Sequence, residues 1–509
     1  MIWYTVYVFE KFRRAICGGL EDNMKRNISV LLLLVLLLSG CGGTETAETT
    51  APAEGTGETQ AAETEPLYLD SLPELDLGGL AINTLIREEA MDEFSAESSG
   101  DVMDTAVYNR NLAIEERFSC KLTYTVELGS WTYAKTFQDT IRGTVMAGDA
   151  TFDMVTGQSN IVQPLNIEGV FVNLLEEEYL DLEKPYWVES YIDGINLKGE
   201  VCTLCGDFAL SSFSNANVIF FNKSLMDNYS LEYPYEEALA GKWTLDRFLG
   251  MSEDVTTDVN GDQVISLEDV RGFCAYNNSI QPLFSSCGFN YTELQADGTR
   301  VLLSPSDALV TVADRMNEFC RTDNFLDANK AFSTGNSVGL EPAMCESFMN
   351  GSYLFMGMVL EGIEDLREME VDFGILPYPK LDEQQSRYYT TILRRYTVAA
   401  VPITAADSSN SALILEAMAA EGCQDIIPQY YEIALKGKYI RDESSSQVLD
   451  LIKDSLYLEF VDMYYSDLGF SDFFSGYVAG SSSGTYISSV ESNRKAWETK
   501  LTALYETNS

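Results

Sequence analysis

Residues 81–156 contain the pattern that decides the fold. The apolar stretch AINTLI at 81–86 precedes a helical pattern, AVYNRNLAIEERF at 106–118, and KLTYTVEL at 121–128 alternates as a strand. A second helical pattern at 136–147 leads to the short apolar segment FDMVT at 152–156. Strands that alternate with helices in this order predict an α/β domain with a parallel sheet.

Further elements of the same kinds follow along the chain. NVIFF at 217–221, FGILP at 373–377 and TVAAVP at 397–402 are short apolar segments typical of buried strands, and helical patterns cover 408–419, 426–436 and 490–505. Thr244 is a predicted N-cap, because a threonine hydroxyl can accept from the first backbone N–H groups of a helix. Trp243 lies at an apolar-periodic position, so we assign it to the core.

The N-terminal region has the features of an export signal. Positive charge in MKR at 24–26 precedes an aliphatic run at 28–38, which ends in LSGC at 38–41 and resembles the lipobox of bacterial lipoproteins. The run is shorter than the ~20 apolar residues that span a bilayer. We therefore expect a signal region at 1–40, with 1–23 an over-extended start before Met24, and a lipid on Cys41. The alternative is an uncleaved anchor helix in which Cys41 has no role.

A flexible linker is predicted at 41–76. Residues 42–66 are rich in Thr, Glu, Ala and Gly and contain no aliphatic side chain larger than Ala. Such a segment buries too little surface to offset its ordering entropy. We expect the folded body to begin near residue 77.

Composition excludes several classes of function. The chain has 79 acidic against 33 basic residues, a net charge of −46, which argues against nucleic-acid binding. It has no histidine, which removes Ser-His-Asp and Cys-His sites and most catalytic zinc sites. Chemistry by a pair of carboxylates stays possible, but acidic runs such as 88–89 and 176–178 are expected by chance in so acidic a chain, and we interpret them as solvated surface.

Eight cysteines lie in the body, at 120, 202, 205, 274, 287, 320, 345 and 423. An even number outside the cytoplasm permits disulfides, but the spacing does not indicate which residues pair. The CTLC sequence at 202–205 lacks the second pair of ligands that a zinc site needs. A local disulfide and buried thiols are the two interpretations left.

The acidic segment DVNGDQVISLED at 258–269 resembles a calcium loop of the EF-hand type. Side-chain oxygens recur at its first, third, fifth and twelfth positions, and Val264 offers a carbonyl at the seventh. The predicted ligands are Asp258, Asn260, Asp262, Val264 and Asp269. The sixth position is Gln rather than Gly, and the twelfth is Asp rather than Glu. We expect a structural Ca²⁺, with an acidic turn that binds no metal as the alternative.

A series of short motifs occurs in order along the body. They are GD at 100–101, AVYNRN at 106–111, FDMV at 152–155, GVFVNL at 169–174, PYW at 185–187, GD at 206–207, FFNKSL at 220–225, GKWTLD at 241–246, FGILPYP at 373–379 and VP at 401–402. Together, behind a lipobox, they resemble the extracellular solute-binding proteins of ABC transporters, the family-one group that includes sugar binders.

The resemblance implies a two-lobed α/β fold of the periplasmic-binding-protein type (type II). Each lobe would be a mostly parallel sheet flanked by helices, with hinge strands between the lobes. The chain would cross between lobes near 211–216 and again near 393–398. Lobe one would then comprise 77–212 and 399–445, and lobe two 213–398 and 446–509.

Ligand-binding candidates follow from position after strands and at the crossings, because ligands of open α/β sheets bind at the carboxyl ends of strands. The candidates are Arg87, Gln158, Ser159, Asn160, Phe213, Asn215, Ser285, Ser286, Met358, Arg394 and Tyr396. Aromatic rings, amides and Arg suit the apolar faces and hydroxyls of sugars.

The expected function is that of a monomeric, lipid-anchored receptor on the extracytoplasmic face of a cell membrane. It would capture a small solute, by resemblance a carbohydrate or oligosaccharide, and deliver it to the permease of an ABC importer without catalysing a reaction. Two alternatives stay open: a lipid-anchored glycoside hydrolase that uses a carboxylate pair, and a surface adhesion lipoprotein.

Overall fold

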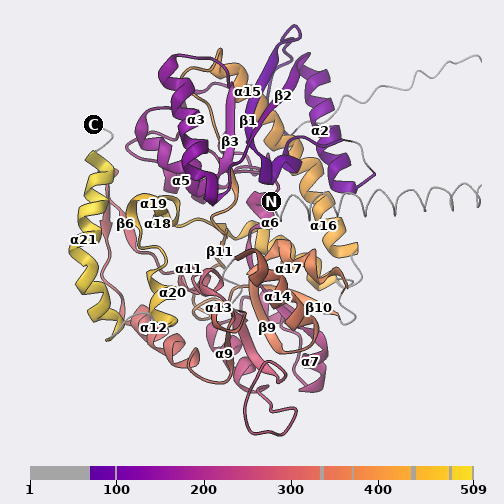
Figure 1. The fold of residues 1–509 in the computed structure, drawn as a ribbon, viewed down its shortest axis with the longest axis vertical. Helices are drawn as coiled ribbons and strands as arrows, with labels where there is room; N and C mark the ends of the chain where they lie inside the picture. Colours follow the sequence, from indigo (N-terminus) through magenta and orange to yellow (C-terminus); the bar gives the residue numbers. More distant parts are fainter. Residues whose placement is uncertain are drawn as a thin grey trace, which may run out of the picture. The chain divides into compact units, whose positions relative to one another are not determined.

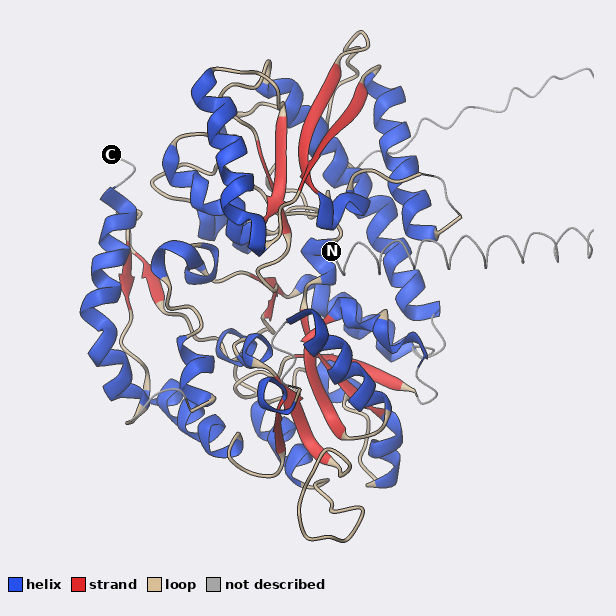
Figure 2. Ribbon diagram, viewed as in Figure 1, coloured by secondary structure: helices blue, strands red, loops and turns tan. Residues whose placement is uncertain are grey.

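Two mixed β-sheets, each covered by helices, form the core of the body (Figures 1 and 2). The structure is a computed structural model that describes residues 69–97, 100–332, 337–368, 372–436, 443–480 and 484–506. The predicted signal region at 1–40, Cys41 and linker residues 42–68 lie outside the described residues. Within the described ranges, no helix combines the length and the apolar character needed to cross a membrane.

Lobe one is built on a four-stranded sheet in the order β12-β3-β1-β2. Its strands are β1 (Ala81–Arg87), β2 (Lys121–Glu127), β3 (Met154–Gln158) and β12 (Thr397–Ala400). Its helices include α2 (Val102–Phe118), α3 (Ala134–Ala147), α4 (Ser159–Val162), α5 (Glu189–Ile195), α15 (Ser408–Glu421) and α16 (Ile427–Lys436). Helices α15 and α16 pack against α2 although they are distant in sequence, so lobe one is assembled from two parts of the chain (Figure 1).

Lobe two is built on a five-stranded sheet in the order β10-β4-β9-β5-β8. Its strands are β4 (Asn217–Asn222), β5 (Arg271–Ala275), β8 (Phe325–Asp327), β9 (Tyr353–Val359) and β10 (Phe373–Pro377). Its helices include α7 (Lys223–Asn228), α8 (Tyr235–Leu239), α9 (Leu245–Glu253), α10 (Asn277–Ile280), α11 (Pro282–Ser286), α12 (Asp307–Phe319), α13 (Ala328–Ala331), α14 (Ser337–Met349) and α17 (Glu443–Asp454).

The C-terminal segment adds short helices and small ladders. The helices are α18 (Phe460–Met463), α19 (Tyr465–Leu468), α20 (Phe473–Val478) and α21 (Tyr486–Glu506). The ladders pair β6 (Thr292–Leu294) with β7 (Arg300–Leu302), and β11 (Thr390–Thr391) with β13 (Leu456–Tyr457). Helix α18 contacts α5, whereas α20 contacts α12, so this segment touches both lobes.

Most predicted elements are confirmed, and their ends have local causes. The Asp101 side chain caps α2 by accepting from two backbone N–H groups, and Gly148 ends α3 at φ +67°. Thr244 caps α9 by accepting from the Arg247 backbone, as predicted. Trp243 is fully buried and its Nε1 donates to the Pro377 carbonyl at 2.9 Å, which confirms its place in the core.

The sheets contain more antiparallel pairing than expected. In lobe one β1 runs parallel to β2 and β3, but β12 is antiparallel to β3. In lobe two β4 is antiparallel to both β9 and β10, and only the pairs β5–β9 and β5–β8 are parallel. The reason is the crossings: β4 and β12 begin where the chain enters a lobe, whereas their neighbours β9 and β3 end there.

The two crossing segments lie side by side. Ala216 and Ile392 form an isolated antiparallel bridge, and the Leu393 N–H donates to the Asn215 carbonyl at 2.9 Å. The first crossing contains the short helix α6 (Ser211–Ser214). A third passage leads from α16 in lobe one to α17, which packs on β10 and α8 of lobe two.

The described end of the predicted linker, 69–76, is packed on the body, so the linker prediction was too long there. The Arg117 guanidinium makes two 2.8 Å bonds to the Asp70 carboxylate, and Leu72 and Leu75 pack against the core. The eight body cysteines are free thiols in the structure. Of the two interpretations of the CTLC pair, buried thiols is confirmed, and burial raises the pKa of Cys202 to about 12.

Candidate functional site

The carboxyl ends of β1 and β3 open into a cavity of about 580 Å³. β1 ends at Arg87 and β3 at Gln158, and both side chains line the cavity. Its volume lies in the ~300–1,000 Å³ range of small-molecule sites. The remaining lining residues are Glu89, Ala90, Asp92, Glu93 and Ser130 of lobe one; Leu210, Ser211, Ser214, Asn215 and Arg395 of the crossings; Glu341, Pro342, Met358, Glu361, Gly362, Glu364 and Asp365 of lobe two; and Tyr430 of α16.

Arg87 connects the end of β1 to the second crossing. Its guanidinium donates to Gln158 Oε1 at 3.3 Å, to the Arg395 carbonyl at 3.0 Å and to Thr397 Oγ1 at 3.1 Å. Its Nε is buried without a partner in the described structure. The side chain therefore joins two strand ends at the floor of the cavity.

Arg395 connects the second crossing to lobe two. Its Nε donates to Asn215 Oδ1 at 2.6 Å, and its terminal nitrogens pair with Glu341 at 3.1 Å and with Glu361 at 3.0 Å. Glu361 lies in the short helix Leu360–Ile363 that follows β9, and Glu341 belongs to α14. These bonds hold the crossing segments against the lobe-two wall of the cavity.

Three carboxylates on the cavity wall have a raised pKa although their side chains keep contact with solvent. Burial, together with the charge of Glu93, raises the pKa of Asp92 to about 6. Burial also raises the pKa values of Glu361 and Asp365, although Arg395 offsets part of the shift at Glu361. The pKa of Glu89 is instead lowered. Burial raises it, but its carboxylate accepts hydrogen bonds from the Gly129 and Ser130 N–H groups at 2.9 and 3.0 Å, and these outweigh the effect of burial.

Four of the eleven predicted ligand residues line the cavity. They are Arg87, Gln158, Asn215 and Met358. Ser285 and Arg394 instead line a much smaller pocket of about 20 Å³ between the second crossing and the C-terminal segment. Ser159, Asn160, Phe213, Ser286 and Tyr396 are absent from the cavity lining.

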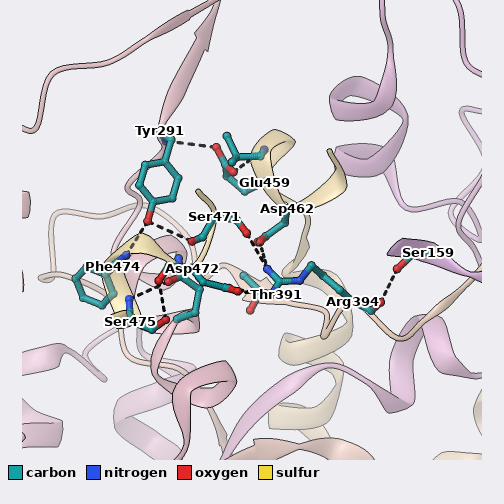
Figure 3. Close-up of polar contacts among 12 residues, drawn as sticks. Ser159, Tyr291, Thr391, Arg394, Glu459, Asp462, Ser471, Asp472, Phe474 and Ser475 are labelled. Carbon is teal, nitrogen blue, oxygen red and sulfur yellow. Dashed lines mark hydrogen bonds and ion pairs between the residues drawn. The ribbon is translucent and has the colours of Figure 1, made fainter. Parts of the chain in front are cut away.

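Arg394 is held by the C-terminal segment (Figure 3). One terminal nitrogen donates to Asp462 at 2.7 Å and to Ser471 at 2.8 Å, and the other contacts both Asp472 oxygens at 2.8 and 2.9 Å. The Ser159 hydroxyl donates to the Arg394 carbonyl at 2.8 Å. Arg394 thus secures the crossing to lobe one and to the C-terminal segment, and its donors are used within the protein.

The other candidates outside the cavity are engaged in packing. Phe213 is fully buried against Tyr431, with ring centroids 5.2 Å apart, and the Tyr396 hydroxyl forms a 3.0 Å hydrogen bond with Gln163. Ser286 is fully buried, and Asn160 accepts a hydrogen bond from the Gln158 side chain at 2.8 Å.

The carboxylates that line the cavity were not among the ligand residues predicted from the sequence. Glu89 was interpreted as solvated surface, and it does contact solvent, but it does so inside the cavity. Arg87 was selected because it follows the predicted strand 81–86, and the same reasoning extends to Glu89, Asp92 and Glu93. For Glu341 the sequence carries no comparable signal, because it lies within α14.

The predicted calcium loop adopts a turn held by its own backbone. The oxygens of Asp258, Asn260, Asp262 and Asp269 accept N–H groups of the loop, and Val264 is exposed. Gln263 at the sixth position has φ +66°, the left-handed conformation that glycine supplies in such loops. Among the described residues, no three Asp, Glu or Cys side chains converge as metal ligands.

Comparison with known proteins identifies the fold of the chain. No protein-family model matches the chain, and no curated protein matches its sequence. Solved structures match over most of it. A sugar transporter protein from Rhizobium etli in an open conformation has 13% identity and a TM-score of 0.55, covering 84% of this chain and 99% of that one. The chain has the two-lobed fold of ABC-transporter solute-binding proteins.

Two further structures agree with this fold. An ABC substrate-binding protein from Listeria monocytogenes, in complex with cycloalternan, has 13% identity and a TM-score of 0.52, covering 84% of this chain and 99% of that one. The GacH receptor of Streptomyces glaucescens, studied unliganded and with acarbose, has 10% identity and a TM-score of 0.51, covering 83% and 99%. At these identities the likeness establishes the fold and leaves the ligand of this chain open.

Proposed function

We propose that the protein is an extracytoplasmic solute receptor that captures a small saccharide between its lobes and delivers it to the permease of an ABC importer. The observation that carries the proposal is the cavity at the carboxyl ends of β1 and β3, because both lobes and both crossings contribute to its wall. A solute bound there contacts both lobes at once, so it stabilises a closed form relative to an open one.

The saccharide class is supported by the structures that share the fold. The Listeria protein was solved with cycloalternan, and the Rhizobium protein is described as a sugar transporter. In this chain Ser214, Asn215 and Gln158 present polar groups to the cavity, as hydroxyl recognition requires. Capture and release need no covalent chemistry, so we propose a binding protein rather than an enzyme.

Attachment to the membrane completes the proposal. A lipid on Cys41 would hold the receptor near its permease, and tethering raises the effective concentration of one partner for the other. Mass spectrometry of the mature N-terminus tests this part: a diacylated Cys41 supports it, and an unmodified N-terminus at another residue refutes it.

Ligand screening tests the function itself. A thermal-shift screen against sugars, peptides and polyamines, followed by calorimetry, is expected to show stabilisation by saccharides. Hydrolysis of a bound oligosaccharide by the purified protein would favour a glycosidase. The absence of stabilisation across all three panels would refute a receptor for small solutes.

A further inference from the structure

The cavity between the lobes carries a large excess of negative charge. Seven of the described side chains that line it are carboxylates, against two guanidinium groups and no lysine. The carboxylates come from both lobes: the segment after β1 supplies Glu89, Asp92 and Glu93, and lobe two supplies the others. A solute that enters this cavity therefore meets a strongly negative potential.

The terminal nitrogens of both guanidinium groups are already used within the protein. Arg395 pairs with Glu341 and Glu361, and Arg87 donates to uncharged oxygen atoms of three neighbours. Seven carboxylates against two guanidinium groups still leave the described cavity wall with a net negative charge, although Arg87 lies in the field of Glu89, Asp92 and Glu93. The two arginines are also poorly placed to serve as the main binding groups for an anionic solute.

Two of the carboxylates face the cavity from opposite lobes. Asp92 lies in the turn Glu88–Glu93 of lobe one, and Asp365 begins the turn Asp365–Glu368 of lobe two. In the part of the chain that the structure describes, no Lys or Arg forms an ion pair with either of them. Burial raises the pKa of both, helped by the charge of Glu93 at Asp92 and of Glu341 at Asp365. A positive charge on the ligand would stabilise the ionised form of such carboxylates more than that of carboxylates already paired with a cation.

The cavity also contains a polar group without a partner. Ser214 is 7% exposed and lines the cavity, yet its hydroxyl makes no hydrogen bond to any described residue. Among the described lining residues, Tyr430 is the one aromatic side chain, and it is 4% exposed. A neutral sugar would thus find a hydroxyl partner but little aromatic surface to cover its apolar face.

We propose that the solute captured in this cavity is a saccharide that carries protonated amine groups. The inference rests on the proposed function and narrows its substrate class. Ammonium groups are donors only, and their hydrogen bonds to carboxylates are charge-assisted and stronger than neutral ones. The Ser214 hydroxyl can bond a hydroxyl of the same solute, whereas the side-chain amides of Asn215 and Gln158 already make hydrogen bonds at both ends within the protein.

The test compares three ligands of one shape. The β-1,4-linked trimers of glucosamine, N-acetylglucosamine and glucose differ only at the second carbon, which carries an ammonium, an acetamide or a hydroxyl group. Calorimetry with the folded, mature protein is expected to give at least about tenfold tighter binding of the glucosamine trimer, the equivalent of one charge-assisted hydrogen bond. Its affinity should fall as salt is raised.

Each outcome separates this inference from the function on which it rests. Equal or tighter binding of the glucose or acetylated trimer would support the receptor function and overturn amine recognition. Binding of spermidine without any trimer would overturn the saccharide function and support amine recognition. Binding of none of the four compounds would overturn both.

Isosteric variants locate the contact. Asp92→Asn and Asp365→Asn are each expected to weaken binding of the glucosamine trimer by about threefold or more, since each removes one charge. Asp149→Asn is the matched control, because Asp149 is exposed and precedes β3 at the end of the sheet opposite the cavity. Unchanged affinity in both cavity variants would refute their role.

Discussion

Replacing Asp92 by Asn should stabilise the ligand-free protein, although Asp92 lines the binding cavity. Burial and the charge of Glu93 raise the pKa of Asp92 from 3.8 to about 6. Between these values the folded protein keeps a proton that the unfolded chain has released. The free energy of unfolding of the wild type therefore falls as pH rises through this window. The Asn variant has no proton to lose, so its advantage grows over the same range and is constant above about pH 6.

The magnitude follows from the same pKa. The difference between 3.8 and about 6 corresponds to about 3 kcal/mol, at about 1.4 kcal/mol per pH unit. Asp92 is partly exposed to water in the open cavity, and water screens its charge. We therefore expect Asp92→Asn to raise the free energy of unfolding by about 1 kcal/mol above pH 6, and the melting temperature by about 1–2 °C.

Denaturant and thermal unfolding of the ligand-free protein at several pH values measure this effect. The difference between Asp92→Asn and wild type should be smallest near pH 4 and largest above pH 6, and Asp149→Asn, a substitution outside the cavity, is measured beside it as the control. Two results would refute an uncompensated charge at Asp92. One is a difference in unfolding free energy between the variant and the wild type that does not change with pH, and the other is a variant less stable than the wild type at neutral pH. If Asp92→Asn is more stable than the wild type but binds the ligand less tightly, Asp92 is retained for function rather than for stability.

Four other perturbations have defined outcomes. Burial raises the pKa of Glu416 to about 7. As pH rises from 4.5 to 7, the free energy of unfolding of the wild type should therefore fall by about 3 kcal/mol relative to that of Glu416→Gln. Unfolding experiments measure this difference, with Glu178→Gln at an exposed position as the control. Arg394→Met leaves two carboxylates without their partner and should cost about 3–5 kcal/mol of unfolding free energy, most of it recovered if those carboxylates are also neutralised. Trp131 is 58% exposed beside Ser130 on the cavity wall, so ligand binding should change its fluorescence, and Trp131→Phe should remove that change. If the loop 258–269 binds calcium in solution, Ca²⁺ should raise the melting temperature and EDTA reverse it; equal melting curves would exclude the metal.

The alternation of strands and helices could be predicted from the sequence because it depends on local apolar patterns, whereas the two lobes were implied by the family resemblance. Strands such as 217–221 and 373–377 consist mostly of apolar residues, and the structure buries them on both faces. The direction of pairing could not be predicted in the same way. Whether β12 runs with or against β3 depends on which lobe the chain has just left, a property of the whole path rather than of the segment.

The site was partly predictable for a similar reason. Arg87 and Gln158 line the cavity because a strand end fixes where the next side chain lies. The second crossing shows where this rule stops. Arg394 and Arg395 are neighbours in one turn, yet Arg394 contacts the C-terminal segment and Arg395 lines the cavity. Sequence alone could not choose between them, because the choice depends on where Asp462 and Asp472 lie after folding.

The carboxylates in the cavity have a consequence for the movement of the lobes. Asp92 belongs to lobe one and Asp365 to lobe two, so under the proposed function closure of the empty protein would bring like charges closer as water leaves and the dielectric falls. That repulsion favours the open form. A ligand shifts the equilibrium only by its difference in affinity between the two forms, and a cation between the two carboxylates supplies such a difference directly. A neutral sugar of the same shape leaves the repulsion in place. The same charges that destabilise the empty protein would therefore select which solute can close it.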